Sequence, residues 1–300
     1  MLILAEFIRA AIRLTTPLLL AALGGAYMQV AGVPNIGMEG MMLFAALIGY
    51  IVSFTTGSWV LGLIFGVLAS VLVGLIYAFL VLKLNADIFA IGITLNILIG
   101  AVAAYIIRQY YDQMSMLISP DVVLFPTISI PFLEKIPILN LLLNNYSILI
   151  PVSFLLVIVT YIVFYKTPYG FWLRAVGSNP AAVSASGKDI HKLRISSFVI
   201  SSVLCGLAGV HLSLGYLGMF ALALVAGRGF IALAIVLFGS GNPIIVLIAS
   251  LIFGAAEAVS LRIPTELIAP QFPLMLPYLL TIIAITLISR FTKTSKSGAS

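Results

Sequence analysis

Runs of about twenty apolar residues recur along the whole chain, separated by shorter polar segments. Each run is long enough to cross the ~30 Å hydrocarbon layer of a membrane as an α-helix, which rises about 1.5 Å per residue. We count about nine spans, within a range of about eight to ten, because glycine and proline interrupt several of them. The predicted spans are Phe7–Ala31, Gly37–Phe54, Trp59–Leu82, Ile88–Tyr110, Ser147–Tyr165, Ile195–Tyr216, Gly218–Gly239, Pro243–Leu261 and Phe272–Phe291.

The composition supports a membrane environment for these spans. Of the 300 residues, 62% are hydrophobic and 8% are charged, and the mean hydropathy is +1.24. A soluble domain lacks the polar residues to cover so much apolar surface. In lipid, backbone groups must bond within the protein, which restricts spans to helices or closed barrels, and barrel strands would alternate over about ten residues. We therefore expect an all-α, polytopic integral membrane protein, with residues 1–300 forming a single transmembrane domain.

Basic residues are unevenly distributed among the segments that join the spans. Residues 166–194 hold five of the 15 Lys and Arg residues against one acid, Asp189, and the tail at 292–300 adds Lys293 and Lys296. The positive-inside rule places both segments in the cytoplasm. The loop at 111–146, in which Lys135 is outnumbered by three acids, then faces outward as an extracytoplasmic loop. Counting the spans back from this loop puts Lys83 inside and the N-terminus outside. The net charge of +6 is explained by the basic residues that set this orientation, and we expect no nucleic-acid partner.

The inventory of reactive residues argues against an enzyme. The single cysteine, Cys205, excludes an internal disulfide and a cysteine metal cluster, and an apolar helix around it predicts a small buried thiol. Neither a G-x-S-x-G nucleophile turn nor an H-E-x-x-H zinc pair is present, and the phosphate-binding G-x-x-x-x-G-K-[ST] loop is missing. We expect no catalytic residue, no metal and no cofactor, so that any ATP is bound by another subunit.

Two charges are flanked by glycines at the start of apolar segments. Glu39 lies between Gly37 and Gly40, and Arg228 lies between Gly227 and Gly229. In both segments, about ten apolar residues follow the second glycine, and the run ends at another glycine. This similarity suggests a faint internal repeat with broken or re-entrant helices. A charge at membrane depth costs roughly 2.5–3.5 kcal/mol unless it is paired or faces water. The hypothesis is that both charges lie near a substrate pathway and close to each other; the alternative is that both snorkel to the interface.

Other polar residues lie within the apolar segments. Asn35 precedes the first glycine-flanked charge, and Asn96 is a lone amide in the run IGITLNIL. We include both with Glu39 and Arg228 as candidate pathway residues, although a buried amide more often bonds one helix to another. Glu257 is expected to form a structural pair with Arg262 or Arg228. For His211, a hydrogen-bonded interhelical histidine is preferred to a proton relay.

The polar segment from Lys166 to Arg194 contains its own helix signals. Pro168 and Gly170 end the preceding span, and FWLRAVG is amphipathic, with Phe171 to Leu173 resting in the membrane interface while Arg174 faces water. Ser178 or Asn179 caps a second short helix, PAAVSAS, which has Pro180 in its first turn and stops at Gly187. The result is a short helix with a low surface of small side chains, which suits a groove on a soluble partner.

The segment resembles the coupling segment of ABC importer permeases that serve ribose-type sugars, branched-chain amino acids and nucleosides. The resemblance also covers NIGMEGMM early in the chain and GLAGVHLSLG with AGRGFIALAIVLFG late in it, and it is nearest to the nucleoside and simple-sugar branch. Lys188 departs from the pattern, because an apolar residue is expected there. By this resemblance the residues that contact the ATPase are Arg174, Gly177, Asn179, Pro180, Ala181, Ala182 and Gly187.

The resemblance implies a permease in the cytoplasmic (inner) membrane of a prokaryote. Its implied partners are a second, related but different permease, two cytoplasmic ATPases and an extracytoplasmic substrate-binding lipoprotein. The implied cargo is a nucleoside or related purine, with a simple sugar as the alternative. An ion-coupled secondary transporter with Glu39 or His211 as its titrating group stays open as the second hypothesis, ahead of a membrane enzyme or scaffold.

Overall fold

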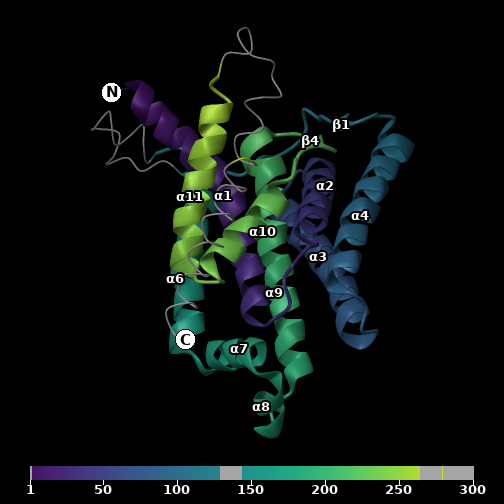
Figure 1. Cartoon of the computed structure of the whole chain (residues 1–300). Coiled ribbons are helices and arrows are strands. Elements are labelled where there is room, and N and C mark those ends of the chain that lie inside the picture. The colour runs from purple at the N-terminus through teal and green to yellow at the C-terminus, as the bar shows by residue number, and fades with distance from the viewer. Residues whose placement is uncertain (1, 129–143, 264–278, 280–300) are drawn as a thin grey trace.

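The computed structural model describes residues 2–128, 144–263 and residue 279, and within these ranges the chain is a bundle of helices (Figure 1). Seven helices of this described part are long and apolar enough to cross a membrane, which confirms the predicted all-α, polytopic class. The predicted span at Phe272–Phe291, the tail at 292–300 and much of the loop at 111–146 lie outside the described residues. The long helices are α1 (Leu2–Val30), α2 (Met38–Thr56), α3 (Trp59–Ala78), α4 (Ile88–Tyr111), α6 (Leu149–Lys166), α9 (Ile190–Val210) and α11 (Pro243–Ser260).

Most predicted spans agree with these helices to within a few residues. Two helices continue beyond their α-helical part through a π-helical turn: α3 through η1 (Phe79–Lys83) and α9 through η3 (His211–Leu217). The sixth span was predicted to begin at Ile195, but α9 begins at Ile190 because Asp189 caps it by accepting a hydrogen bond from the Lys192 N–H. Lys192 and Arg194 therefore lie on the first turns of a helix and not in a loop.

The prediction of a helical span throughout Gly218–Gly239 is wrong in its first half. Only α10 (Arg228–Gly239) is helical, and its 12 residues extend about 18 Å, which is too short to cross the membrane alone. Gly218 (φ 67°) and Gly227 (φ 79°) adopt the left-handed conformation, which breaks the helix. Beyond α10, Gly241 packs against Val30 at the far end of α1. The segment thus consists of bends, turns and a two-residue strand, followed by a short helix.

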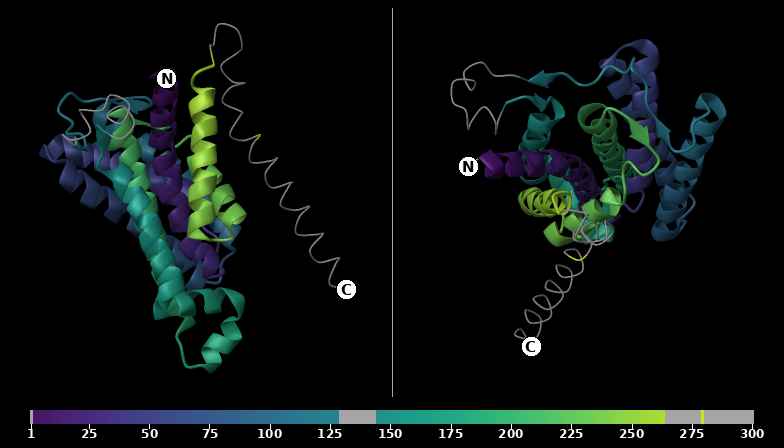
Figure 2. Two further views of the ribbon diagram at one scale, coloured as in Figure 1. Left: turned by 90° about the vertical axis from the view of Figure 1, so that its left-hand side faces the viewer. Right: turned by 90° about the horizontal axis from the view of Figure 1, so that it is seen from above.

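The two ends of the bundle carry different small elements. At one end, here called the α8 end, the helices α7 (Pro168–Ser178) and α8 (Pro180–Ala185) project beyond the long helices (Figure 2). At the other, the strand end, β1 (Met116–Leu117) pairs with β4 (Phe220–Ala221), and β2 (Thr127–Ile128) pairs with β3 (Tyr146–Ser147). The start of α1 lies at the strand end, where Arg9 donates to the carbonyl of Asn144 (3.4 Å).

The chain direction reveals two units of opposite orientation. In the first, α1 runs toward the α8 end, α2 begins inside the bundle and returns, and α3 runs back toward the α8 end (Figure 1). In the second, α9 runs toward the strand end, α10 begins inside the bundle and returns, and α11 runs to the strand end. The middle helix of each unit starts at a glycine and has a charge in its first turn. This is the arrangement of an inverted repeat with broken helices.

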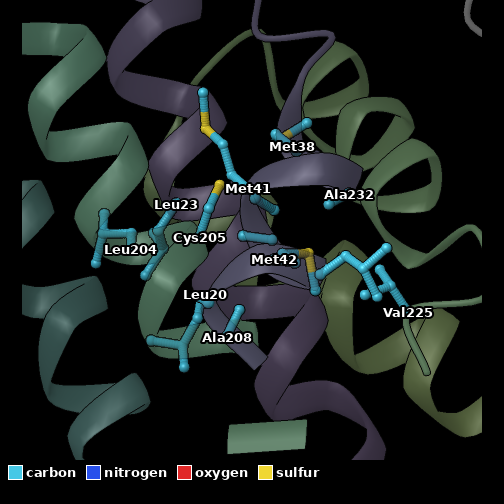
Figure 3. Close-up of a cluster of buried hydrophobic side chains, with 14 of the residues drawn as sticks. Leu20, Leu23, Met38, Met41, Met42, Leu204, Cys205, Ala208, Val225 and Ala232 are labelled. Atoms are coloured by element: carbon cyan, nitrogen blue, oxygen red, sulfur yellow. The ribbon is translucent and has the colours of Figure 1, made fainter. Parts of the chain in front are cut away.

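The core lies where α1, α2, α9 and α10 meet. Leu20 and Leu23 of α1, Met41 and Met42 of α2, and Cys205 of α9 point into one cluster (Figure 3). The Cys205 thiol is fully buried there, as its apolar helix predicts. By contrast, α3, α4 and α6 expose many large apolar side chains, including Leu72, Ile97 and Ile158, as helices facing lipid do.

Candidate functional site

The start of α2 is held inside the bundle by two asparagine side chains. Asn96 of α4 accepts a hydrogen bond from the N–H of Gly40 (2.8 Å) and donates to the carbonyl of Ile36 (2.9 Å). Asn35 accepts from the N–H of Gly37 (2.9 Å) and donates to the hydroxyl of Ser201 on α9 (2.8 Å). A helix that begins at membrane depth exposes backbone N–H groups that water cannot reach. The two amides supply the missing partners.

The start of α10 is capped by the side chain of Glu39. One carboxylate oxygen accepts from the N–H of Gly227 (2.7 Å) and the other from the N–H of Gly229 (2.8 Å). Glu39 itself lies in the first turn of α2, so its negative charge faces the positive ends of two helix dipoles. A β-carbon added to Gly229 would lie 2.5 Å from the backbone nitrogen of Glu39, so glycine is required for this approach.

Arg228 points its guanidinium away from this cap and toward α11. It forms an ion pair with Glu257 and donates to the carbonyls of Leu224 (3.0 Å) and Val225 (3.2 Å). Both side chains of the pair are only 14% exposed. The predicted pairing of Glu257 with Arg228 is therefore confirmed, and the guanidinium also satisfies carbonyls of the turns that precede α10.

Together these residues form what we call the half-helix junction. It consists of Asn35, Glu39, Asn96, Arg228 and Glu257. The Glu39 carboxylate lies against the backbone of the residues on either side of Arg228, so the two charged residues are close together as expected. Asn96 forms the hydrogen bonds between helices that its position in an apolar helix favours. The sequence did not predict that Glu39 binds backbone amides instead of a side chain. Every residue except proline has a backbone N–H, so residue identity does not indicate which of these groups lacks a partner.

A pathway role for Asn35, Glu39, Asn96 and Arg228 stays a prediction. Three cavities within the described part of the chain lie near the ends of the bundle, and none of the three is lined by these four residues. The expectation for His211 does not hold within the described residues. His211 is buried, and neither ring nitrogen has a hydrogen-bond partner there.

The second candidate site is the segment of residues 166–194, which comprises α7, α8 and the start of α9 and is called the coupling loop here after its predicted role. Thr167 caps α7 by accepting from the N–H of Gly170 (3.2 Å), and Leu173 and Val176 are fully buried against the bundle. Leu173 was expected in the membrane interface, but the protein core covers it because it lies on the inner face of α7. Phe171, with 57% of its surface exposed, keeps the predicted outward position.

Arg174, which was expected to face water, is partly exposed. Its guanidinium lies 4.8 Å from the ring centre of Tyr165 on α6, and its Nε donates to the carbonyl of Gly170 (3.3 Å). Lys188, the departure from the family pattern, lies 5.4 Å over the ring of Trp172. The Arg174 contact therefore attaches the coupling loop to α6, whereas the Lys188 contact joins two parts of the loop itself. Burial raises the pKa of the Tyr169 hydroxyl, which bonds Ser196 on α9 (2.7 Å).

The predicted cap and end of the second short helix are both present. Asn179 accepts from the N–H of Ala182 (3.1 Å), Pro180 opens α8, and Gly187 follows in the left-handed conformation (φ 72°). Val183 is buried and holds α8 to the protein. The small side chains of Pro180, Ala181 and Ala182 are exposed and form a low surface at the α8 end.

A direct backbone contact joins the coupling loop to α1. Gly177, at the end of α7, packs against Gly32, just beyond the end of α1, and a β-carbon at Gly177 would collide with the carbonyl of Val30. Gly32 has a φ of 77°, so glycine is favoured on both sides of the contact. A displacement of α7 would therefore be transmitted to α1, the helix at the centre of the bundle.

A polytopic helix bundle with broken helices at its centre and a capped helix projecting from one end has features found in transport proteins, and the sequence family of the chain identifies it as the permease of an ABC importer. The chain belongs to the family described as branched-chain amino acid transport system / permease component, whose sequence profile matches residues 7–285. The chain is thus a multi-pass membrane protein that acts with other components of an ABC transporter.

Three relatives show the range within this family. The chain is 30% identical to the nucleoside ABC transporter permease protein NupC of Lactococcus lactis subsp. cremoris, over 91% of this chain and 89% of the relative. It is 32% identical to the guanosine ABC transporter permease protein NupQ of Bacillus subtilis, over 95% and 92%. It is 29% identical to a putative glucose ABC transporter permease protein of Haloferax volcanii, over 86% and 78%. No solved structure gives a significant match.

Proposed function

We propose that this chain moves a nucleoside, or a related purine, across the cytoplasmic membrane of a prokaryote. The α8 end faces the cytoplasm and the strand end faces outward. Two of the three relatives described above are named for nucleoside or guanosine transport, and they match nearly the full chain. Since the third is named for glucose, a simple sugar is the second candidate cargo.

Separate ATPase subunits supply the energy in this proposal. The observation that carries it is the exposed surface of α8 on a chain whose sequence lacks a phosphate-binding loop. Pro180, Ala181, Ala182 and Gly187 form the face that enters a groove on the ATPase. Asn179 positions that face by capping the helix. The permease itself performs no covalent chemistry.

The proposed transmission path runs from α8 through α7 to α1. ATP-driven closure of the ATPases displaces α8, and the contact between Gly177 and Gly32 passes the displacement to the end of α1. Arg174 holds α7 to α6 during this movement through Tyr165. The half-helix junction keeps the inner ends of α2 and α10 joined, so that the two inverted units move as linked bodies between outward- and inward-facing states.

The proposed assembly contains a second, related permease, two ATPases and an extracytoplasmic binding lipoprotein. Each bacterium that carries the nucleoside or guanosine relative also carries a second permease relative named for the same cargo. This pattern supports a pair of different permeases over two copies of one chain.

The cargo is tested on the assembled importer. The binding protein is purified without added ligand, and its bound molecule is identified by mass spectrometry. Uptake of labelled guanosine into proteoliposomes is then competed with an excess of unlabelled nucleoside or glucose. A bound nucleoside and competition by nucleosides alone are expected. A bound sugar, with uptake that glucose abolishes, would replace the nucleoside proposal with the sugar alternative.

A further inference from the structure

The largest of the three cavities lies outside both sites, between the end of α3 and the start of α9. Its volume is about 500 Å³, within the 300–1,000 Å³ typical of small-ligand sites. Five of the lining residues are apolar, among them Leu75, Phe79 and Ile195, and are called the apolar wall. The other three, Lys83, Asn85 and His191, carry an ammonium, an amide and an imidazole and are called the polar wall.

The depth of this cavity follows from the span to which it belongs. The span Trp59–Lys83 has 25 residues, which extend about 37 Å, so Trp59 and Lys83 lie near opposite membrane–water interfaces. Leu75 lies about two turns before Lys83 and Phe79 about one turn before it, and their side chains are 43% and 49% exposed. The apolar wall thus faces the hydrocarbon layer, and the polar wall lies at the level of the lipid headgroups on the α8 end.

The π-helical turn η1 shapes the polar wall. Within this turn the Lys83 ammonium lies 5.5 Å over the ring of Phe79. Asn85 follows in the left-handed conformation (φ 53°), which asparagine tolerates, and it lines the cavity beside Lys83. His191, on the first turn of α9, completes the wall.

The neighbouring acids are already engaged as helix caps. Asp87 accepts from the N–H of Ala90 (2.8 Å) at the start of α4. Asp189 accepts from the N–H of Lys192 (3.1 Å) and pairs with its ammonium (3.7 Å). The cavity wall itself therefore presents donors and positive charge, and among the described residues that line it there is no carboxylate.

We propose that this cavity binds an anionic phospholipid. Its phosphate is held by Lys83, with donors from Asn85 and His191, and one acyl chain follows Leu75, Phe79 and Ile195 into the hydrocarbon layer. The combination of basic headgroup wall and continuous lipid-facing wall selects a lipid over a free phosphate, which would leave the apolar wall uncovered. The binding is independent of the cargo, and only its assignment to the cytoplasmic leaflet rests on the proposed orientation.

The first experiment titrates the purified full chain with phosphatidylglycerol or phosphatidylcholine of the same acyl composition and counts retained lipids by native mass spectrometry. We expect retention of phosphatidylglycerol to fall about fivefold in Lys83→Gln, since one basic residue near an anionic surface is worth about this factor. Lys83→Arg restores the charge and is expected to restore retention. Lys166→Gln, at the end of α6 and outside the cavity, is the matched control and leaves retention unchanged.

The second experiment locates the lipid in the assembled importer. A photoreactive phosphatidylglycerol in vesicles is expected to label peptides containing residues 75–85 or 191–195, and Lys83→Gln is expected to reduce this label. Equal retention of both lipids, or an unchanged Lys83→Gln variant, would overturn the proposal. A label that disappears when the partner subunits assemble would also overturn it, by showing that another protein covers the cavity.

Discussion

Glu39 and Gly229 are separated by 190 positions in the sequence, yet the Glu39 carboxylate accepts a hydrogen bond from the Gly229 N–H at 2.8 Å. The contact joins the first turns of α2 and α10, the two helices that begin inside the bundle. Each inverted unit contributes one partner. This bond therefore ties together the two inverted units at the inner ends of α2 and α10.

Replacing Gly229 with alanine tests the closeness of the two helix ends. The new methyl group meets the backbone of Glu39, and we expect a loss of about 1–3 kcal/mol in stability, measured as a lower thermal unfolding midpoint in detergent. Gly100→Ala is the matched control. Gly100 is a helical glycine of α4 with open space at its β position, so the substitution is expected to leave stability unchanged or raise it by up to about 1 kcal/mol. Equal effects of the two substitutions would contradict the packing described.

Replacing Glu39 with glutamine tests the double cap of α10. A carboxylate accepts from both Gly227 and Gly229, whereas an amide has one oxygen and leaves one N–H unpaired. We expect a loss of about 1–3 kcal/mol and at least a tenfold fall in uptake by the reconstituted importer. Glu6→Gln, at the exposed start of α1, serves as the control and is expected to behave as wild type. Wild-type uptake by Glu39→Gln would remove Glu39 from the mechanism.

The ion pair between Arg228 and Glu257 is tested by a double-mutant cycle. Removing one partner of a buried pair costs about 3–5 kcal/mol, because it leaves an uncompensated charge. Arg228→Met and Glu257→Gln are therefore each expected to destabilise the chain strongly, while the double variant recovers part of the loss. Thermal unfolding of the four proteins in one detergent gives the coupling. Strictly additive losses would show that the two side chains act independently.

The pH dependence of the coupling loop follows from Asp189. The hydrogen bond from the Lys192 N–H, with the nearby Lys192 ammonium, lowers the pKa of this carboxyl below its ordinary value of 3.8. A lowered pKa means that the cap is fully formed above that value and is lost only as the pH falls through the lowered pKa. We expect hydrogen-exchange protection of the Lys192 amide to be constant from pH 8 to pH 5. Asp189→Asn keeps a capping oxygen and should behave alike, whereas loss of protection by pH 6 in wild type would contradict the assignment.

The sequence predicts those features that depend on local chemistry. The starts at Trp59, Ile88 and Pro243 follow from apolar runs with clear boundaries, and α8 follows from the Asn179–Pro180 pair. A hydropathy pattern does not distinguish a helix from a series of turns of equal polarity, which is why the helix was predicted to begin at Gly218 and not at Arg228. The partners of Glu39 are main-chain groups of a distant segment, and residue identity carries no information about them.

The central claim is that this permease moves its cargo with energy that separate ATPases deliver at α8. The most direct test compares guanosine uptake into proteoliposomes that contain the assembled importer with uptake by this chain alone under a proton or sodium gradient. We predict ATP-dependent uptake by the assembly, its loss together with ATPase association when residues 180–187 are deleted, and no uptake by the isolated chain. Gradient-driven uptake by the chain alone, or ATPase association that survives the deletion, would contradict the account.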